Sequence, residues 1–299
     1  MTETRAAMGT LVSITTVRDQ PQTAAAVGRA LDWFATVEAC CSRFEPESEL
    51  RQLCGQLDRD VPLSPLLFEA LRAALFVAQA SGGAFDPTLG AQLEAAGYDR
   101  NDRTGARAAS GIVPQARASF RDVCLDTRRR SARLQRPLLL DLGGVAKGLA
   151  VDLAARELAA LGDVGGDFAI DAGGDLYLAG RNPAGHAWQV GLRHPRQPEA
   201  TFETVPVSGA AICTSGEYER GRHLLDPRQQ GAPAAARACS ATVIAPNAMA
   251  ADALATAAMV LGPHHGLALL QREAVAGLIL SPELQRFTTP DWPHGQGPA

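Results

Sequence analysis

The sequence DLGGVAKG, residues 141–148, joins two segments with different patterns of apolar residues. It follows the apolar run PLLL at residues 137–140, and it leads into residues whose apolar positions recur at helical spacing. Two glycines between a strand and a helix let the backbone turn tightly and let a ligand approach the first, unpaired N–H groups of the helix. The stretch therefore predicts a strand, a turn and a helix over about residues 145–161, with a place for a phosphate group at the turn.

Lys147 within this stretch can add a positive charge to a phosphate site. The stretch matches neither of the phosphate-loop patterns G-x-x-x-x-G-K-[ST] and G-x-G-x-x-G. A tight turn beside an exposed lysine explains the same residues. Taken alone, the motif leaves both interpretations open.

A second Asp-x-Gly-Gly follows the apolar residues of FAIDAGG, residues 168–174. Two such strand ends with a helix between them predict a β-α-β crossover whose strand ends lie side by side. Because no low-complexity linker divides the chain, we expect one α+β domain over residues 1–290, with mixed sheets, packed helices and a loose tail at 291–299. The repeated motif is also compatible with an internal duplication.

The spacing of apolar residues, together with glycine and proline positions that interrupt helices and strands, locates the other helices and strands. Helical spacing is found over residues 22–40, over 65–80 before Ser81, Gly82 and Gly83, and over 248–262. Strand patterns are found over residues 8–16, 167–174, 176–180, 187–193, 203–213, 241–247 and 274–281, with a hairpin over 121–141.

Composition limits the classes of function. The 299 residues are 46% hydrophobic and carry a net charge of −4, so the chain can bury a core and offers no basic surface for nucleic acid. The six cysteines form no C-x-x-C pair, which is typical of buried thiols in a reducing compartment. The N-terminal residues show no apolar signal segment or lipobox, and no window approaches 18 uninterrupted apolar residues. We therefore expect a cytoplasmic protein without membrane insertion; a chain from which an export signal had been trimmed would look the same.

Two further stretches carry candidate chemistry. In ADALATA, Asp252 and Thr256 stand at i and i+4, so a carboxylate and a hydroxyl project from one helical face as hard oxygen ligands of the kind Mg²⁺ takes. A solvated acid and a threonine that bonds back to its own helix explain the same pair. In TSGEYERGRHLLDP, residues 214–227, His223 stands among acids and arginines and suits the role of general base, although a structural histidine fits as well.

Eight stretches together resemble, in order, the motif series of the ApbE-type flavin transferases, which are FAD:protein FMN transferases. The resemblance covers about residues 8–280. It is carried by MGT (8–10), SRFEPESELRQL (42–53), GGAFDPTLG (82–90), DLGGVAKGLAVD (141–152), DAGGDLYLAG (171–180), TSGEYER (214–220), HLLDP (223–227) and ADALATA (251–257). The sequence departs from the family pattern at DPRQQG, where Asp-Pro-Arg-Thr-Gly is usual.

The resemblance implies a Mg²⁺-dependent enzyme that cleaves the FAD pyrophosphate, attaches FMN through a phosphoester to a threonine or serine of a target flavoprotein, and releases AMP. It implies Mg²⁺ ligands at Asp252, Thr256 and the carbonyl of Ala146. The catalytic residues we expect are Lys147, for charge on the phosphate, and His223 as base, with Asp226 as the second candidate. The implied FAD contacts are Met8, Ser48, Glu49, Asp86, Thr88, Gly144, Lys147, Asp152, Gly174, Asp175, Thr214, Ser215, Gly216 and His223. An FAD pyrophosphatase and an FAD-binding protein without turnover are the alternatives.

Overall fold

The computed structural model of the chain describes residues 1–18, 20–100, 105–162, 166–216, 225–229, 232–233 and 238–293. Its main feature is an eight-stranded sheet in which every neighbouring pair is antiparallel. The strands in spatial order are β1 (Thr2–Ala7), β2 (Thr10–Thr16), β6 (Phe168–Ala172), β7 (Asp175–Ala179), β10 (Ala210–Gly216), β13 (Ser240–Ala245), β14 (Ala276–Leu280) and β15 (Arg286–Thr288). The α+β class is confirmed.

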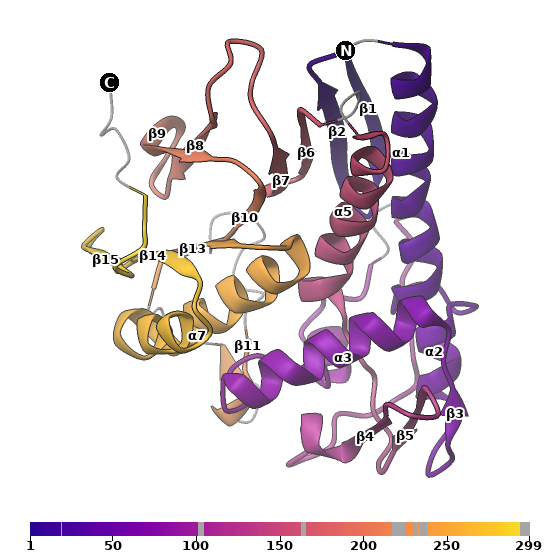
Figure 1. Ribbon diagram of the computed structural model, residues 1–299. Helices are drawn as coiled ribbons and strands as arrows, with labels where there is room; N and C mark the ends of the chain where they lie inside the picture. Colours follow the sequence, from indigo (N-terminus) through magenta and orange to yellow (C-terminus); the bar gives the residue numbers. More distant parts are fainter. Residues whose placement is uncertain are drawn as a thin grey trace.

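Helices cover one face of this sheet (Figure 1). The described helices are α1 (Pro21–Cys41), α2 (Glu49–Cys54), α3 (Pro65–Ala80), α4 (Gly90–Ala95), α5 (Gly143–Ala159) and α7 (Ala248–Arg272), with short 3₁₀ turns at Phe120–Asp122 and Pro227–Gln229; α1, α5 and α7 are the ones that pack on the sheet. Helix α1 contacts β1 and β2, α5 contacts β6 and β7, and α7 contacts β10, β13 and β14. The helices therefore follow the sheet from one edge to the other.

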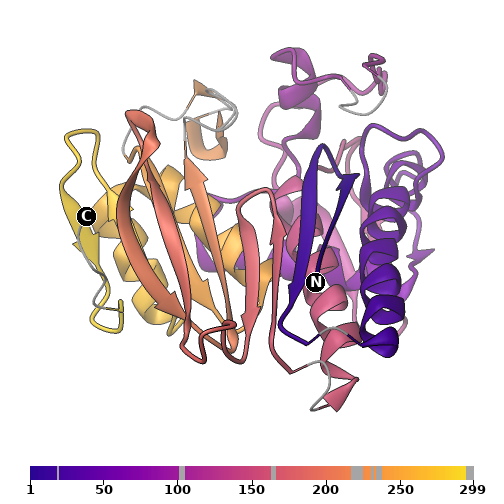
Figure 2. The same ribbon diagram turned by 90° about the horizontal axis from the view of Figure 1, so that it is seen from above.

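Alternation along the strands produces two hydrophobic cores. In β10, Ala211 and Cys213 belong to the core beneath the helices, whereas Ile212 between them belongs to a smaller core on the opposite face. A separate hairpin, β8 (Trp188–His194) and β9 (Gln197–Val207), lies over that opposite face (Figure 2). The sheet thus has a helical layer on one side and a two-stranded layer on the other.

The remaining strands are short. One small sheet has the order β3 (Val61–Pro62), β5 (Ser131–Leu134) and β4 (Val123–Asp126), and another joins β11 (Leu225–Asp226) to β12 (Ala232–Pro233). The hairpin expected over residues 121–141 is therefore confirmed only over its first part.

The apolar run before DLGGVAKG is not a sheet strand, and the predicted β-α-β crossover is wrong. Residues 137–142 lie outside the strands, where Gly90 N–H donates to the Leu139 carbonyl at 3.0 Å and Asp141 N–H donates to the Pro87 carbonyl at 2.7 Å. The second copy of the motif leaves β6, which pairs antiparallel with β2 and β7. The internal duplication is accordingly not confirmed.

Turns shorten one predicted strand and divide another. Residues 8–16 lose their first two members to a turn between β1 and β2, because Met8 and Gly9 adopt φ of +50° and +72°. Residues 203–213 are split at Ser208 and Gly209, where the chain leaves β9 and enters β10. Both turns use the left-handed conformation that glycine adopts without strain.

Helix α7 runs along the core and bears the candidate metal ligands. Asn247 caps its first turn by accepting from Ala250 N–H at 2.8 Å. The expected stop at Gly262 is a kink with φ +76°, after which Pro263 starts a further helical run to Arg272. Among the described residues, α7 has the length and apolar composition of a membrane span, but 61% of its apolar window is buried in the fold, as in a core helix.

Candidate active site

A cavity of about 1490 Å³ opens where the β1–β2 turn, the start of α5, the first half of α7 and the β8–β9 hairpin meet. Pockets for drug-sized ligands are on the order of 300–1,000 Å³, so this cavity has room for a ligand as long as a dinucleotide. Its lining includes most of the residues implied by the sequence: Met8, Asp86, Gly144, Ala146, Lys147, Gly174, Asp175, Thr214, Ser215, Gly216, Asp252 and Thr256.

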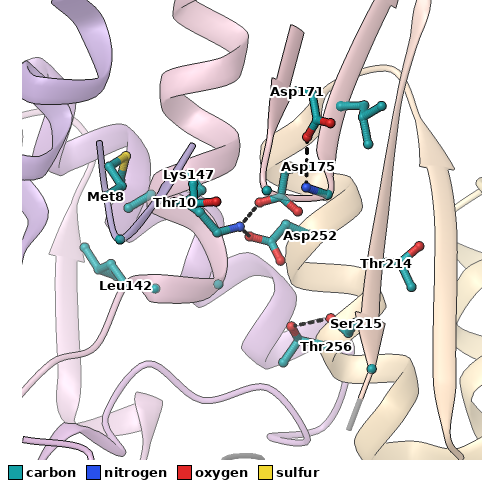
Figure 3. A pocket seen from close by; sticks show the side chains of 18 of the residues that line it. Met8, Thr10, Leu142, Lys147, Asp171, Asp175, Thr214, Ser215, Asp252 and Thr256 are labelled. Atoms are coloured by element: carbon teal, nitrogen blue, oxygen red, sulfur yellow. Dashed lines mark hydrogen bonds and ion pairs between the residues drawn. The ribbon is translucent and has the colours of Figure 1, made fainter. Parts of the chain in front are cut away.

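An ammonium and two carboxylates meet in the lining of the cavity (Figure 3). Lys147 Nζ of α5 forms an ion pair with Asp175 at the start of β7, and it lies 3.7 Å from Asp252 Oδ2 of α7. All three side chains are almost buried; that of Lys147 is 13% exposed. Burial disfavours the ammonium, but the charges of Asp175 and Asp252 outweigh it and raise the pKa of Lys147 above its usual range. The lysine is therefore charged at neutral pH.

Hydroxyl groups extend this cluster along α7 and β10. Thr256 lies one helical turn after Asp252, and its Oγ1 is 3.1 Å from Ser215 Oγ. Thr214 Oγ1 is 2.9 Å from Thr242 Oγ1 on the neighbouring strand. The Asp252 and Thr256 pair predicted from their spacing thus borders the cavity.

The turn before α5 is held by a buried arginine. Arg43 Nε donates to Asp141 Oδ2 at 2.5 Å, and Asp141 Oδ1 accepts from Gly143 N–H at 2.7 Å. Arg43 also donates to the Tyr98 carbonyl at 2.6 Å and stacks its guanidinium 4.0 Å from the Phe44 ring centre. This network fixes the start of α5 where it borders the cavity, which a bare glycine turn would not do.

Glycine is required at two places in these turns. A Cβ on Gly144 would lie 2.8 Å from Phe85 Cε2, so the helix can start against that ring only without a side chain. In the second Asp-x-Gly-Gly, Gly173 has φ +65° and Asp171 Oδ1 accepts from Gly174 N–H at 3.0 Å. Both motifs are therefore tight Asp-anchored turns that face the same cavity.

Some implied site residues lie outside the cavity lining and have structural partners. Ser48 caps α2, Glu49 accepts from Ser64 N–H at 2.7 Å, and Thr88 donates to Asp86 at 2.7 Å. Asp152 likewise lies outside the lining. Asp86 itself does line the cavity; burial raises its pKa, although hydrogen bonds from Thr88 and Phe120 N–H oppose the shift.

Of the two candidate bases, the structure describes only Asp226. His223 lies outside the described residues. Asp226 is buried at 1% exposure and does not line the cavity. Its two oxygens accept from the Arg228 guanidinium at 2.9 and 3.0 Å. This ion pair makes Asp226 a poorly placed base in the present arrangement.

Two parts of the lining were not anticipated from sequence. One is Arg43. In the sequence, only its position beside the aromatic Phe44, within the otherwise polar stretch at residues 42–49, sets it apart. The other is an apolar wall, formed where the β8–β9 hairpin crosses the sheet. It consists of Leu176, Leu178, Trp188, Val190, Leu192 and Ile212. An alternating strand pattern does not tell which face another strand pair will cover.

The profile of the ApbE family matches residues 8–279. This chain belongs to the ApbE family. One relative, the FAD:protein FMN transferase of Treponema pallidum, is 34% identical over an alignment of 307 positions that covers 92% of this chain and 83% of the relative. The FAD:protein FMN transferase of Haemophilus influenzae is 26% identical over 257 residues, which cover 80% of this chain and 73% of the relative.

Solved ApbE structures have the same fold. The flavin transferase ApbE of Vibrio cholerae superposes with a TM-score of 0.84 at 23% identity, covering 98% of this chain and 97% of the other. The apo form of the Pseudomonas stutzeri flavinyl transferase ApbE gives 0.80 at 27% identity, covering 97% and 95%. The family resemblance stated from eight sequence motifs is confirmed.

Proposed function

We propose that this ApbE-family chain is a Mg²⁺-dependent FAD:protein FMN transferase. It would cleave the FAD pyrophosphate, attach FMN by a phosphoester bond to a threonine or serine of a target flavoprotein, and release AMP. One observation carries the proposal: the Lys147, Asp175, Asp252 and Thr256 cluster lines a cavity of about 1490 Å³, which has room for a dinucleotide. The names of the relatives support the same activity.

The donor set fits Mg²⁺. Asp252 and Thr256 offer a carboxylate and a hydroxyl, and Ala146 borders the same cavity. Among the described residues no group of three or more His, Cys, Asp or Glu side chains could hold a metal ion. A small number of protein ligands is enough for Mg²⁺, because the ion usually keeps several waters and takes substrate phosphate oxygens as its other ligands. When bound, the ion would neutralise charge on the phosphate oxygens and orient the pyrophosphate.

The protein's own groups would orient and stabilise the reacting phosphate. Lys147 Nζ lies 3.7 Å from Asp252 Oδ2; its ammonium would move from Asp175 and Asp252 toward the phosphate oxygens as charge develops there. The N–H of Gly144 in the first turn of α5, which borders the cavity, would support the same charge. The apolar wall of the β8–β9 hairpin would exclude water from one side of the ligand.

The transfer itself is an in-line displacement. The acceptor hydroxyl oxygen forms a bond to the FMN phosphorus, the bond from that phosphorus to the bridging oxygen breaks, and AMP leaves. The hydroxyl proton passes to a base, for which we propose His223 on the family resemblance, because the Asp226 carboxylate is held by Arg228. We further propose that the protein acts in the cytoplasm; its six cysteines are free thiols, as a reducing compartment would keep them.

One assay tests this function against the alternatives. The chain is incubated with FAD, Mg²⁺ and a candidate acceptor flavoprotein, and AMP, free FMN and protein-bound flavin are measured together. Transfer predicts AMP and bound flavin in equal amounts, abolished by EDTA and by an acceptor whose target threonine is replaced by alanine. AMP with an equal amount of free FMN, unchanged by any acceptor, would instead establish a pyrophosphatase. Tight FAD binding without AMP would establish a binding protein.

A further inference from the structure

Asp152 of α5 forms a bond to a second helix rather than to the cavity. Its side chain is buried, and it accepts from Ala248 N–H at 2.7 Å through Oδ1 and from Met249 N–H at 3.1 Å through Oδ2. Those two amides open α7, and the first amides of a helix have no partner within it. A carboxylate at this position also interacts favourably with the positive end of the helix dipole.

The first turn of α7 is thus capped from two sources. Asn247, on the same chain segment, accepts from Ala250 N–H at 2.8 Å, which is a local cap. Asp152 comes from a different helix, so its two bonds hold α7 in place against α5 as well as capping it. The two caps bond different amides and can be removed separately.

Close backbone packing reinforces the same contact. A Cβ on Gly148 of α5 would lie 2.5 Å from both the Cα and the N of Met249. The start of α7 therefore rests directly on the α5 backbone, between Lys147 and Asp152 in sequence. Little freedom is left for one helix to slide on the other.

This contact lies one helical turn from the candidate metal ligands. Asp252 follows Ala248 by one turn and Thr256 by two, whereas Ala146 and Lys147 stand on α5. The proposed metal site is therefore divided between the two helices, and the carboxylate of Asp152 fixes their relative position. Asp152 does not line the cavity, and both its oxygens already accept from α7.

We propose that Asp152 is a positioning residue for the divalent metal: it holds Asp252 and Thr256 at the right place relative to Ala146 and Lys147 and makes no contact with FAD. The proposal rests on the function proposed above, since it presumes a metal at this site. It differs from the FAD contact that the sequence resemblance implied. Residues that orient metal ligands from outside typically change metal affinity by about 10–100-fold when mutated.

The test compares Asp152→Asn with Asn247→Ala, a matched variant that loses a cap from the same helical turn. Asn keeps the size of the side chain but can accept only through its carbonyl oxygen, so one amide of α7 loses its partner. Binding of Mn²⁺ alone is followed by electron paramagnetic resonance, FAD affinity by flavin fluorescence in EDTA, and stability by thermal melting. Both variants are expected to melt lower than the wild-type chain.

The expected result is a dissociation constant for Mn²⁺ about tenfold higher in Asp152→Asn, with Asn247→Ala and the FAD affinity of both variants within about twofold of wild type. Equal Mn²⁺ affinity in the two variants would overturn the proposal, and so would a loss of FAD affinity in Asp152→Asn with Mn²⁺ binding intact. A wild-type chain that binds no Mn²⁺ overturns it as well. The proposed function is tested by a different measurement: it fails if the wild-type chain shows no Mg²⁺-dependent AMP release.

If melting shows Asp152→Asn unfolded at the assay temperature, Gly148→Ala replaces it. That variant leaves the carboxylate in place and pushes the start of α7 away from α5. We expect the same rise in the Mn²⁺ dissociation constant, and an unchanged value would count against positioning through this contact.

Discussion

The Lys147 ammonium of α5 and the Asp252 carboxylate of α7 lie 3.7 Å apart, and Asp175 of β7 pairs with the same lysine. One buried cation therefore faces two buried anions, which leaves a net negative charge. In the protein without ligands, the Lys147 ammonium balances part of the charge of the two carboxylates. When Lys147 turns to a phosphate, a bound divalent ion can balance that charge instead.

Lys147→Met should destabilise the chain, because it leaves the carboxylates of Asp175 and Asp252 buried without their cation. Removal of one partner of a buried ion pair costs about 3–5 kcal/mol. Mg²⁺ should restore part of that loss, so the rise in melting temperature on adding Mg²⁺ should be larger in Lys147→Met than in the wild-type chain. Thermal melts with and without Mg²⁺ measure this difference, and an equal rise in both proteins would speak against a shared site.

Asp252→Ala should abolish Mg²⁺-dependent AMP release while the protein stays folded, because alanine is the best helix former. Thr256→Val removes a neutral hydroxyl ligand and should reduce the rate less than Asp252→Ala does. AMP release across a Mg²⁺ titration, with circular dichroism as the control for folding, compares the two. Turnover near the wild-type level in Asp252→Ala would remove Asp252 from the metal site.

His223→Asn tests the base. If His223 accepts the hydroxyl proton, the variant should bind FAD with nearly unchanged affinity and turn over about 10²-fold more slowly at saturating FAD. Flavin fluorescence titrations give the affinity, and AMP release gives the rate. Recovery of most of the rate by excess FAD would show instead that His223 only contacts the ligand.

The ionisation of Asp152 should appear in the pH dependence of stability. Burial raises its pKa from the ordinary 3.8 to about 6, against the lowering effect of the Ala248 and Met249 amides. Between about pH 4 and pH 6 the folded protein holds a proton that the unfolded chain releases, so this residue's contribution to stability falls as the pH rises, by about 3 kcal/mol. Urea unfolding of the wild-type chain and Asp152→Asn at several pH values should show their difference changing in that window. A difference that is constant with pH would exclude the raised pKa.

Much of the helical layer could be predicted from sequence, because its signals are local. The stretch from Pro65 to Ala80 is helical from end to end, with Ser64 as cap and the Ser81, Gly82, Gly83 stop that the sequence displays. The apolar run at residues 137–140 predicts a strand but lies outside the sheets, since buried extended chain and buried strand share the same composition. Only its hydrogen bonds to the loop at residues 87–90 distinguish the two.

The site was predictable where one motif supplies neighbouring groups, as Asp252 and Thr256 do on one face of α7. It was not predictable where distant segments converge. Nothing local places Asp175 against Lys147, Arg43 against Asp141, or the β8–β9 hairpin over the apolar wall. The role of Asp152 is of the same kind, since its partners are the amides of residues 248 and 249.

We propose that one cavity brings the metal, the pyrophosphate and Lys147 together, and a crystal structure with FAD and Mn²⁺ would test this arrangement. Anomalous scattering locates the manganese without reference to the surrounding density. We predict one peak bounded by the Asp252 carboxylate, the Thr256 hydroxyl and the Ala146 carbonyl, with pyrophosphate oxygens on the ion and Lys147 Nζ turned from Asp175 to a phosphate oxygen. FAD bound with its pyrophosphate away from this cluster, or manganese at other residues, would rule this arrangement out.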